Sequence, residues 1–374
     1  MARRSVGARL LLLLAPALLV GLGFGGGWLF ATAPVRKRAG KRQATATLGG
    51  ALRLKGAAID PAVARCFHDP EAAAREWDRY SYAVPTAPAP FVGAIPAPGE
   101  HANARIDPFG LRGTRPLALP KPAGTVRVFL LGGSTAYGSG APDQARTPAG
   151  YLEAALARAL GKPVEAFACA CPAWASAHER IAVENRVRLW EPDLVIALSG
   201  VNDADWGEKG RDPLWLRTYE DEHAFRLLDA ALGRAGLGGA QDVVAVAPGP
   251  IPVERVAAGL VANARLAAAA LDPVPYLLCL QPHLAVTTKP LTAREARFLG
   301  ERRAEDVEYE RRAFALYREG LAAAGLRWAD LHPVVDARPA EEELFLDTCH
   351  FGDKGNELLA ARMAELALPL LSGR

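Results

Sequence analysis

The stretch VRVFLLGGST at residues 126–135 decides the fold. Its first six residues form a short, mostly apolar run that Gly132 and Gly133 end, which is typical of a buried strand followed by a turn. Four further short apolar segments are interpreted as strands, at residues 164–170, 194–199, 275–281 and 326–331. Strands that alternate with helical patterns predict a parallel sheet covered on both faces. We therefore expect the α/β class: a three-layer α/β/α sandwich with a central, mostly parallel five-stranded sheet.

Amphipathic runs with stop signals, such as Gly161 after the first of them, predict the covering helices. They are expected at residues 147–160, 176–190, 219–232, 253–270, 305–324 and 354–371, with a further short strand at 243–246. Residues 43–120 are rich in proline, which breaks helices and central strands. Apart from one short helix at 61–77, we expect this part to be an irregular stalk and arm, and residues 121–374 to form the main domain.

Polar side chains follow the predicted strands where ligands bind to such sheets, beyond the carboxyl ends. Ser134 follows the first strand, and Asn202 follows the third. Asp347 and His350 come after the fifth strand and a loop. A serine, a histidine, an aspartate and an asparagine on one rim are the parts of an acyl-transfer site. Taken singly, each motif is more often a turn or a helix cap; their combination points to catalysis.

The chemistry assigns a role to each residue type. The Ser134 hydroxyl needs a base to become a nucleophile, and the His350 imidazole has a pKa near working pH. Asp347, three residues earlier, can reach back to orient the ring. The Asn202 amide and the backbone N–H groups of Ser134 and Ala170 are candidate donors to the oxyanion of the transition state. Two glycines before the serine would let the backbone turn sharply.

These motifs resemble the SGNH/GDSL hydrolases. Gly132-Gly-Ser-Thr135 resembles the family's first block, Gly200-Val-Asn-Asp203 the third, and Asp347-Thr-Cys-His350 the fifth. The resemblance covers roughly residues 105–370, including Gly110-Leu-Arg-Gly113, a lead-in found in many exported members. It implies a flavodoxin-like sandwich with a catalytic domain at 121–374. The second block normally offers a glycine N–H to the oxyanion; here the matching residue is read as Ala170, where a positive φ would be strained.

Two more residues on this rim are candidate substrate contacts. Asp203 follows Asn202 in the third block, and His283 follows the fourth strand. For His283 a purely structural role remains an equal alternative. We expect no metal site, because Cys169-x-Cys171 with His178 lacks a second paired element of metal ligands. We also expect no cofactor, because the glycine-rich loop at 132–140 matches neither a P-loop nor a dinucleotide fingerprint.

The charge is uneven along the chain, and this excludes one class of partner. Residues 1–42 hold eight Lys/Arg and no Asp/Glu, whereas the other residues carry 36 basic and 41 acidic side chains. A nucleic-acid partner is therefore not expected. Leu10 to Ala33 contains no charge in 24 residues, which is long enough for a membrane-spanning helix. We expect residues 1–42 to be a membrane anchor with basic flanks.

A cleaved signal segment is the alternative for this amino-terminal part, because Ala31-Thr-Ala33 has the form of a cleavage site. Pro34 directly after it makes cleavage less favourable. The resemblance to exported members implies that the catalytic domain lies outside the cytoplasm, in the periplasm or at the cell surface. The basic residues after the apolar stretch favour the opposite orientation.

Three functions remain open at this point. The first is a serine esterase that removes acyl groups from a small molecule, glycan or lipid. The second is an O-acyltransferase that uses the same residues to modify a surface polysaccharide. The third is a non-catalytic binding module, which the intact set of Ser134, Asn202, Asp347 and His350 disfavours.

Overall fold

An eight-stranded sheet forms the centre of the fold, in the order β10-β9-β8-β6-β7-β5-β4-β3. The computed structural model describes residues 59–81, 83–211, 230–237 and 249–372. The strands of the sheet are β3 Gly99–Glu100, β4 Arg105–Ile106, β5 Arg112–Gly113, β6 Val126–Gly132, β7 Val164–Ala170, β8 Leu194–Ser199, β9 Tyr276–Leu280 and β10 Trp328–Asp330. The five strands from β10 to β7 pair in parallel, and β5, β4 and β3 continue the sheet antiparallel.

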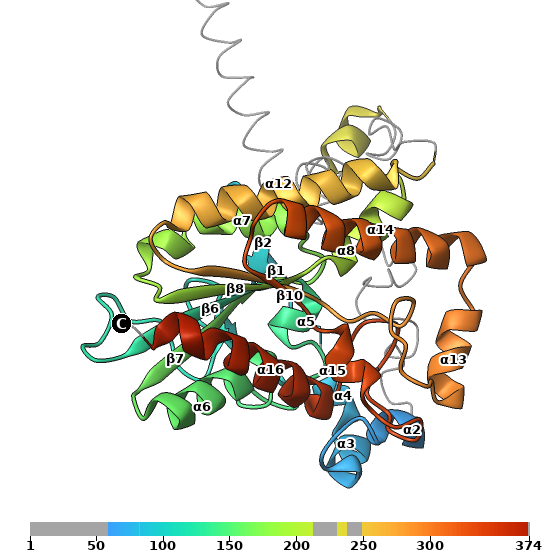
Figure 1. Cartoon of the computed structure of the whole chain (residues 1–374), viewed down its shortest axis with the longest axis horizontal. Helices are drawn as coiled ribbons and strands as arrows, with labels where there is room; N and C mark the ends of the chain where they lie inside the picture. Colours follow the sequence, from blue (N-terminus) through green and yellow to red (C-terminus); the bar gives the residue numbers. More distant parts are fainter. Residues whose placement is uncertain (1–58, 82, 212–229, 238–248, 373–374) are drawn as a thin grey trace, which may run out of the picture. The chain divides into compact units, whose positions relative to one another are not determined.

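Helices cover both faces of this sheet (Figure 1). The helices of the described residues are α2 Pro61–Ala64, α3 Pro70–Arg75, α4 Trp77–Tyr80, α5 Ser134–Tyr137, α6 Pro148–Leu160, α7 Ser176–Asn185, α8 Val201–Glu208, α12 Val253–Leu271, α13 Ala293–Gly300, α14 Ala304–Ala323, α15 His332–Asp336 and α16 Asp353–Leu371. Successive side chains of a strand point to opposite faces. Accordingly, Phe129 and Leu131 pack with α7, α12 and α14, whereas Val128 and Leu130 pack with α6 and α16. The predicted three-layer α/β/α sandwich is confirmed.

The prediction of only five strands was wrong. The five parallel strands are the predicted ones, but residues 99–113 add three strands of two residues each. Strands this short carry no alternating pattern that a sequence could reveal. A separate antiparallel hairpin, β1 Thr86–Ala89 with β2 Gly93–Pro96, precedes them. The region expected to be irregular therefore contains two antiparallel arrangements.

The helix predictions hold for the long helices and fail for the short ones. The single helix expected at 61–77 is three short helices, α2 to α4, and the one at 176–190 ends at Asn185 and is followed by a 3₁₀ turn. The helices α5, α8, α13 and α15 were not predicted. The expected strand at 243–246, nearly all of the helix at 219–232, and the apolar residues 10–33 lie outside the described residues. Within the described ranges, no helix is both long and apolar enough to cross a bilayer.

Candidate active site

Three side chains from distant parts of the chain form a hydrogen-bonded series at the carboxyl end of the sheet. Ser134 directly follows Gly133 after β6 and begins α5, and its side chain is half-buried. Nε2 of His350 lies 2.6 Å from Oγ of Ser134. Nδ1 of the same ring lies 2.7 Å from Oδ2 of Asp347. The structure thus unites the predicted serine, histidine and aspartate, 216 positions apart at their widest.

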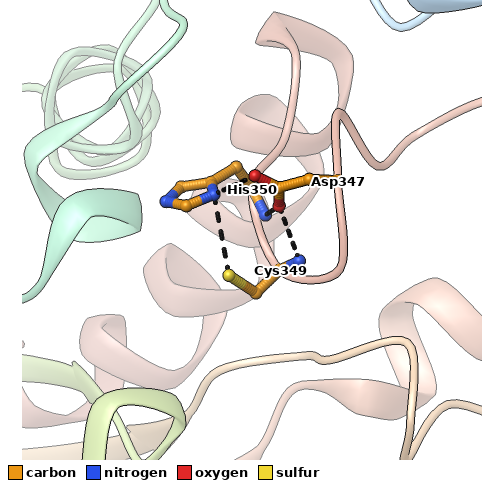
Figure 2. Close-up of side chains that lie close together, drawn as sticks. All are labelled: Asp347, Cys349 and His350. Atoms are coloured by element: carbon orange, nitrogen blue, oxygen red, sulfur yellow. Dashed lines mark hydrogen bonds and ion pairs between the residues drawn. The ribbon is translucent and has the colours of Figure 1, made fainter. Parts of the chain in front are cut away.

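The Asp-x-x-His spacing works because the aspartate also holds the loop backbone. Oδ1 of Asp347 accepts hydrogen bonds from the N–H groups of Cys349 and His350, each at 2.9 Å. A bridge between Phe345 and Phe351 closes the loop at its base. Figure 2 shows the carboxylate of Asp347 between the loop backbone and the His350 side chain. One carboxylate therefore fixes both the loop and the ring orientation.

The Asp347–His350 pair shifts the pKa of both groups. Burial raises the pKa of the Asp347 carboxyl, but the His350 ring and the hydrogen bonds outweigh burial and hold it well below its usual value. Burial lowers the pKa of His350, and the Asp347 carboxylate overcomes this and raises it well above the ordinary value. The carboxylate thus makes the ring a stronger base than free imidazole.

Both glycines before the serine are required by close approaches of neighbouring atoms. Gly132 has a φ of +147°, and a Cβ added there would lie 2.4 Å from the carbonyl oxygen of Leu198 in β8. Gly133 has an ordinary negative φ, but its Cβ would lie 2.2 Å from Nδ2 of Asn202. The predicted sharp turn is therefore present at Gly132, whereas Gly133 is needed to admit the asparagine amide beside the serine.

Asn202 stands in the first turn of α8 and is half-buried. Its Nδ2 donates to the carbonyl oxygen of Trp174 at 2.7 Å. An amide nitrogen carries two hydrogens, so one of them holds the side chain and the second remains to donate elsewhere. The Gly133 contact puts this group next to the Ser134 backbone. Its position fits the role that the sequence suggested.

The second block differs in detail from the expectation. Ala170 is the last residue of β7 and pairs with Gly132, and its φ is not positive. The residue with a left-handed backbone in this loop is Ala173, with a φ of 71° and an exposed side chain. It precedes Trp174, the partner of Asn202. The strain expected at Ala170 therefore occurs three residues later, at Ala173. It could not be predicted from the sequence, because alanine rarely adopts this conformation.

A buried arginine supports the serine from the other end of α5. Arg112 in β5 is 1% exposed and donates to the carbonyl oxygens of Tyr137, Gly138 and Asn103. Tyr137 is the last residue of the helix that Ser134 begins. Arg112, within the lead-in motif singled out in the sequence, thus binds the carbonyl groups at the carboxyl end of the helix that Ser134 begins.

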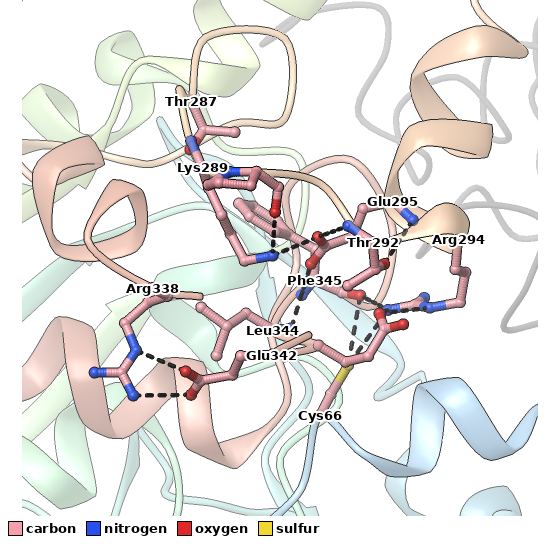
Figure 3. A network of polar contacts seen from close by, with 12 residues as sticks. Cys66, Thr287, Lys289, Thr292, Arg294, Glu295, Arg338, Glu342, Leu344 and Phe345 are labelled. Carbon is pink, nitrogen blue, oxygen red and sulfur yellow. Dashed lines mark hydrogen bonds and ion pairs between the residues drawn. The ribbon is translucent and has the colours of Figure 1, made fainter. Parts of the chain in front are cut away.

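The loop that carries His350 is supported from two sides. On one side, Nε2 of Gln281 and Oγ1 of Thr135 both donate to the carbonyl oxygen of Cys349. On the other, a network of buried ion pairs binds the segment leading into it (Figure 3). In that network Nζ of Lys289 lies 2.7 Å from Oε2 of Glu295, with both side chains fully buried.

A second ion pair belongs to the same network. Arg294 pairs with Glu343 at 2.9 Å and also donates to the carbonyl oxygens of Phe345 and Leu346. The thiol of Cys66 bonds the same Phe345 oxygen at 3.5 Å (Figure 3). Residues 59–80 are thereby linked to the strand-like segment directly before Asp347.

The two predicted substrate contacts are buried. Asp203 is 1% exposed and accepts hydrogen bonds from the N–H and the hydroxyl of Ser176, at the start of α7. Burial raises its pKa to about 6. His283 is 2% exposed, and its Nδ1 accepts from the N–H of Ala285. Burial lowers the pKa of His283 to about 3, so the ring is neutral. Both side chains bond neighbouring segments of the chain inside the protein. For His283 this agrees with the purely structural role that the sequence left open.

Two groups of side chains among the described residues offer three possible metal ligands each. Asp205, Glu208 and Glu310 form one, but Arg302 lies 3.1 Å from Glu208 and 2.6 Å from Glu310, so a guanidinium already balances their charge. Asp347, Cys349 and His350 form the other. Cys169, Cys171 and His178, the set weighed in the sequence, do not come together as a metal-binding group.

Comparison with known proteins identifies the family. Residues 130–358 match the GDSL-like Lipase/Acylhydrolase family, which is more than half of the chain. Among solved structures, a lipase/acylhydrolase from Enterococcus faecalis is 18% identical over 65% of this chain and 95% of its own, with a TM-score of 0.40. A carbohydrate acetylesterase from Sinorhizobium meliloti is 14% identical over 66% of this chain and 99% of its own, with a TM-score of 0.38. No curated protein sequence matches. The chain belongs to the GDSL-like lipase/acylhydrolase family.

Proposed function

We propose that the protein is a serine esterase that removes a short acyl group from a carbohydrate. One observation carries the proposal: the continuous series from Ser134 through His350 to Asp347, with contacts of 2.6 and 2.7 Å. These distances lie within hydrogen-bond reach of a nucleophile, its base and the group that orients the base. A non-catalytic module would need neither the series nor its supports, so the constellation argues against that alternative.

In the proposed reaction, Ser134 Oγ attacks the ester carbonyl while Nε2 of His350 takes its proton. The Asp347 carboxylate stabilises the imidazolium that forms. The proposed donors to the oxyanion are the second N–H of the Asn202 amide and the backbone N–H of Ser134. Ala170 is not among them, because the Cys171 N–H bonds Gly132 and the preceding N–H of Ala170 therefore points away from β6. The imidazolium then protonates the leaving alcohol. A water molecule, deprotonated by the same ring, attacks the acyl-enzyme and releases the acid.

The exposed surface favours a polar substrate over a lipid. Among the described residues, the large hydrophobic side chains with high exposure are Phe91, Leu119, Leu189, Leu237 and Leu266. None of them belongs to the loops around Ser134, Asn202 or His350. Instead, this rim carries the half-buried indole of Trp206, which donates to the Ala173 carbonyl oxygen and lies beside the cations of Lys209 and Arg211. An amphipathic ring of this kind suits a sugar better than a long acyl chain.

An O-acyltransferase would share every step up to the acyl-enzyme. The difference lies in the second attack, where a sugar hydroxyl would replace water. Transfer of acetyl to a polysaccharide acceptor faster than hydrolysis would therefore favour this second candidate.

The direct test is hydrolysis of p-nitrophenyl acetate by the purified chain, compared with a long-chain nitrophenyl ester. We expect the acetate to be preferred and Ser134→Ala to abolish the activity. Ser139→Ala, a half-buried serine in the same loop, is the matched control and should retain it. A fluorophosphonate should label Ser134 alone. Activity that persists in Ser134→Ala, or a label on another residue, would remove Ser134 from the nucleophile role.

We further propose that residues 10–33 anchor the protein in a membrane with its catalytic part outside the cytoplasm. The uncharged stretch of 24 residues and the resemblance to exported members support this. Protease added to intact cells should degrade the catalytic part. A protected catalytic part, digested only after lysis, would contradict the proposed orientation.

A further inference from the structure

Asp347, Cys349 and His350 bring a carboxylate oxygen, a thiol sulfur and a ring nitrogen close together (Figure 2). Sγ of Cys349 lies 3.6 Å from Nδ1 of His350, and Oδ2 of Asp347 lies 2.7 Å from the same nitrogen. The sulfur, nitrogen and oxygen all lie within 4.8 Å of one another. The proposed reaction uses the aspartate and the histidine but assigns nothing to the thiol.

We propose that Asp347, Cys349 and His350 form an inhibitory site for a thiol-binding divalent cation such as Zn²⁺. Thiolate and imidazole together select zinc over magnesium or calcium, which prefer oxygen ligands. The binding itself is independent of the proposed esterase function; only the inhibition rests on it.

The observed spacing fits a tetrahedral zinc ion. Zinc binds sulfur at about 2.3 Å and imidazole nitrogen at about 2.0–2.1 Å, so two such ligands of one ion lie about 3.6 Å apart. The Cys349 sulfur and the His350 Nδ1 are separated by that distance already. Oδ2 of Asp347 now lies 2.7 Å from Nδ1, in the direction that the ion would take. The carboxylate oxygen must therefore swing off this line and lie about 3.3 Å from Nδ1 for both to bind one ion. A water molecule would complete the four ligands.

Cys349 is the most exposed of the five cysteines, and the charges near its thiol favour a cation. Cys349 is half-buried, whereas the other four cysteines are buried. Burial raises the pKa of the Cys349 thiol, and the carboxylates of Asp347 and Asp205 add to this effect against the His350 ring. The same two negative charges attract a divalent ion to this position.

Binding would block the base by changing its tautomer. In the resting series, His350 carries its proton on Nδ1, toward Asp347, and Nε2 accepts from Ser134. A zinc ion on Nδ1 displaces that proton, which moves to Nε2, while the Cys349 thiol releases its own proton to solvent. Nε2 then donates a hydrogen bond and has no lone pair with which to take the serine proton. Inhibition therefore needs no movement of Ser134.

Binding is tested without reference to activity by titrating the purified chain with Cd²⁺ and recording the ultraviolet thiolate-to-metal charge-transfer band. We expect one equivalent of Cd²⁺ to produce the band in the wild type, and Zn²⁺ to compete it away. Cys349→Ser should abolish the band. Cys279→Ala, which removes a thiol buried in β9, should keep it. A band that survives Cys349→Ser, or no band in the wild type, would overturn the proposal.

Inhibition is tested on p-nitrophenyl acetate, with each variant compared with its own metal-free rate. Zn²⁺ should inhibit the wild type, a chelator should reverse this, and Mg²⁺ should have no effect. Cys349→Ser should need at least about tenfold more Zn²⁺. His68→Ala controls for binding at the exposed His68–Glu357 pair and should respond as the wild type does. Equal zinc sensitivity of wild type and Cys349→Ser would overturn the inhibitory role. Cadmium binding in a chain without esterase activity would instead contradict only the proposed function.

Discussion

Replacing Gly133 by alanine tests how closely the serine and the asparagine are packed. The added Cβ would lie 2.2 Å from Nδ2 of Asn202, about 1.3 Å short of ordinary van der Waals contact. The backbone of Gly133 has a negative φ, so alanine avoids the left-handed penalty there and the effect is mainly steric. The asparagine amide must therefore leave its position and break its 2.7 Å bond to Trp174.

The magnitude follows from the group that is displaced. If the Asn202 amide is an oxyanion donor, moving it should lower kcat by about 10²–10³, and Asn202→Ala should cost the same. Overpacking should also destabilise the fold by about 1–3 kcal/mol. In the double variant Gly133→Ala/Asn202→Ala, the amide is absent, and so is most of its steric overlap with the added Cβ. Its kcat should therefore match that of Asn202→Ala alone, rather than fall by the product of the two losses.

Steady-state kinetics on p-nitrophenyl acetate and urea unfolding of the four proteins would measure both effects. Gly259→Ala is the control, because it is exposed in α12 with no atom within 4 Å of the added Cβ. It should leave kcat unchanged and raise helix stability slightly. Full activity of Gly133→Ala would refute the packing argument. Losses that multiply in the double variant would show that the two residues act separately.

Three further outcomes follow from the site and its supports. Because Asp347 raises the pKa of His350, and the neutral ring is the active base, the pH–rate profile should rise with a midpoint above 6.5; Asp347→Asn should shift this midpoint to lower pH and reduce kcat by about 10⁴. Glu295→Gln strands the buried ammonium of Lys289 and should cost about 3–5 kcal/mol in urea unfolding. Ala173→Gly removes the penalty of a φ of 71° and should raise the melting temperature, whereas a lower melting temperature would contradict the left-handed backbone.

The sequence was sufficient for the parts of the fold that rest on apolar patterns. The apolar runs at 126–131, 164–170 and 194–199 are buried strands, because their side chains pack against helices on both faces of the sheet. Part of the candidate site was predictable for a similar reason. Strand ends in a parallel sheet share one edge, so Ser134 after β6 and Asn202 after β8 had to lie near each other.

Features that depend on tertiary contacts were not predictable. Arg112 and Lys289 are charged and would ordinarily be placed at the surface, yet both are buried because specific partners satisfy them. The left-handed backbone of Ala173 could not be predicted, because the sequence has no glycine at this position to indicate it. His283 and Asp203 stand at the ends of strands, as functional residues do, but neighbouring elements cover them.

The short strand β5 has a practical consequence for anyone who shortens this protein. It pairs with the outer edge of β7 through Arg112 and Gly113. A fragment beginning at residue 121 or 130 would leave that edge open, with unpaired amides along a strand whose seven residues are all buried. Such an edge invites strand addition between molecules and hence aggregation. Recombinant versions intended for crystallisation should therefore start at or before Ile59, which also retains the Cys66 segment packed against Gly352.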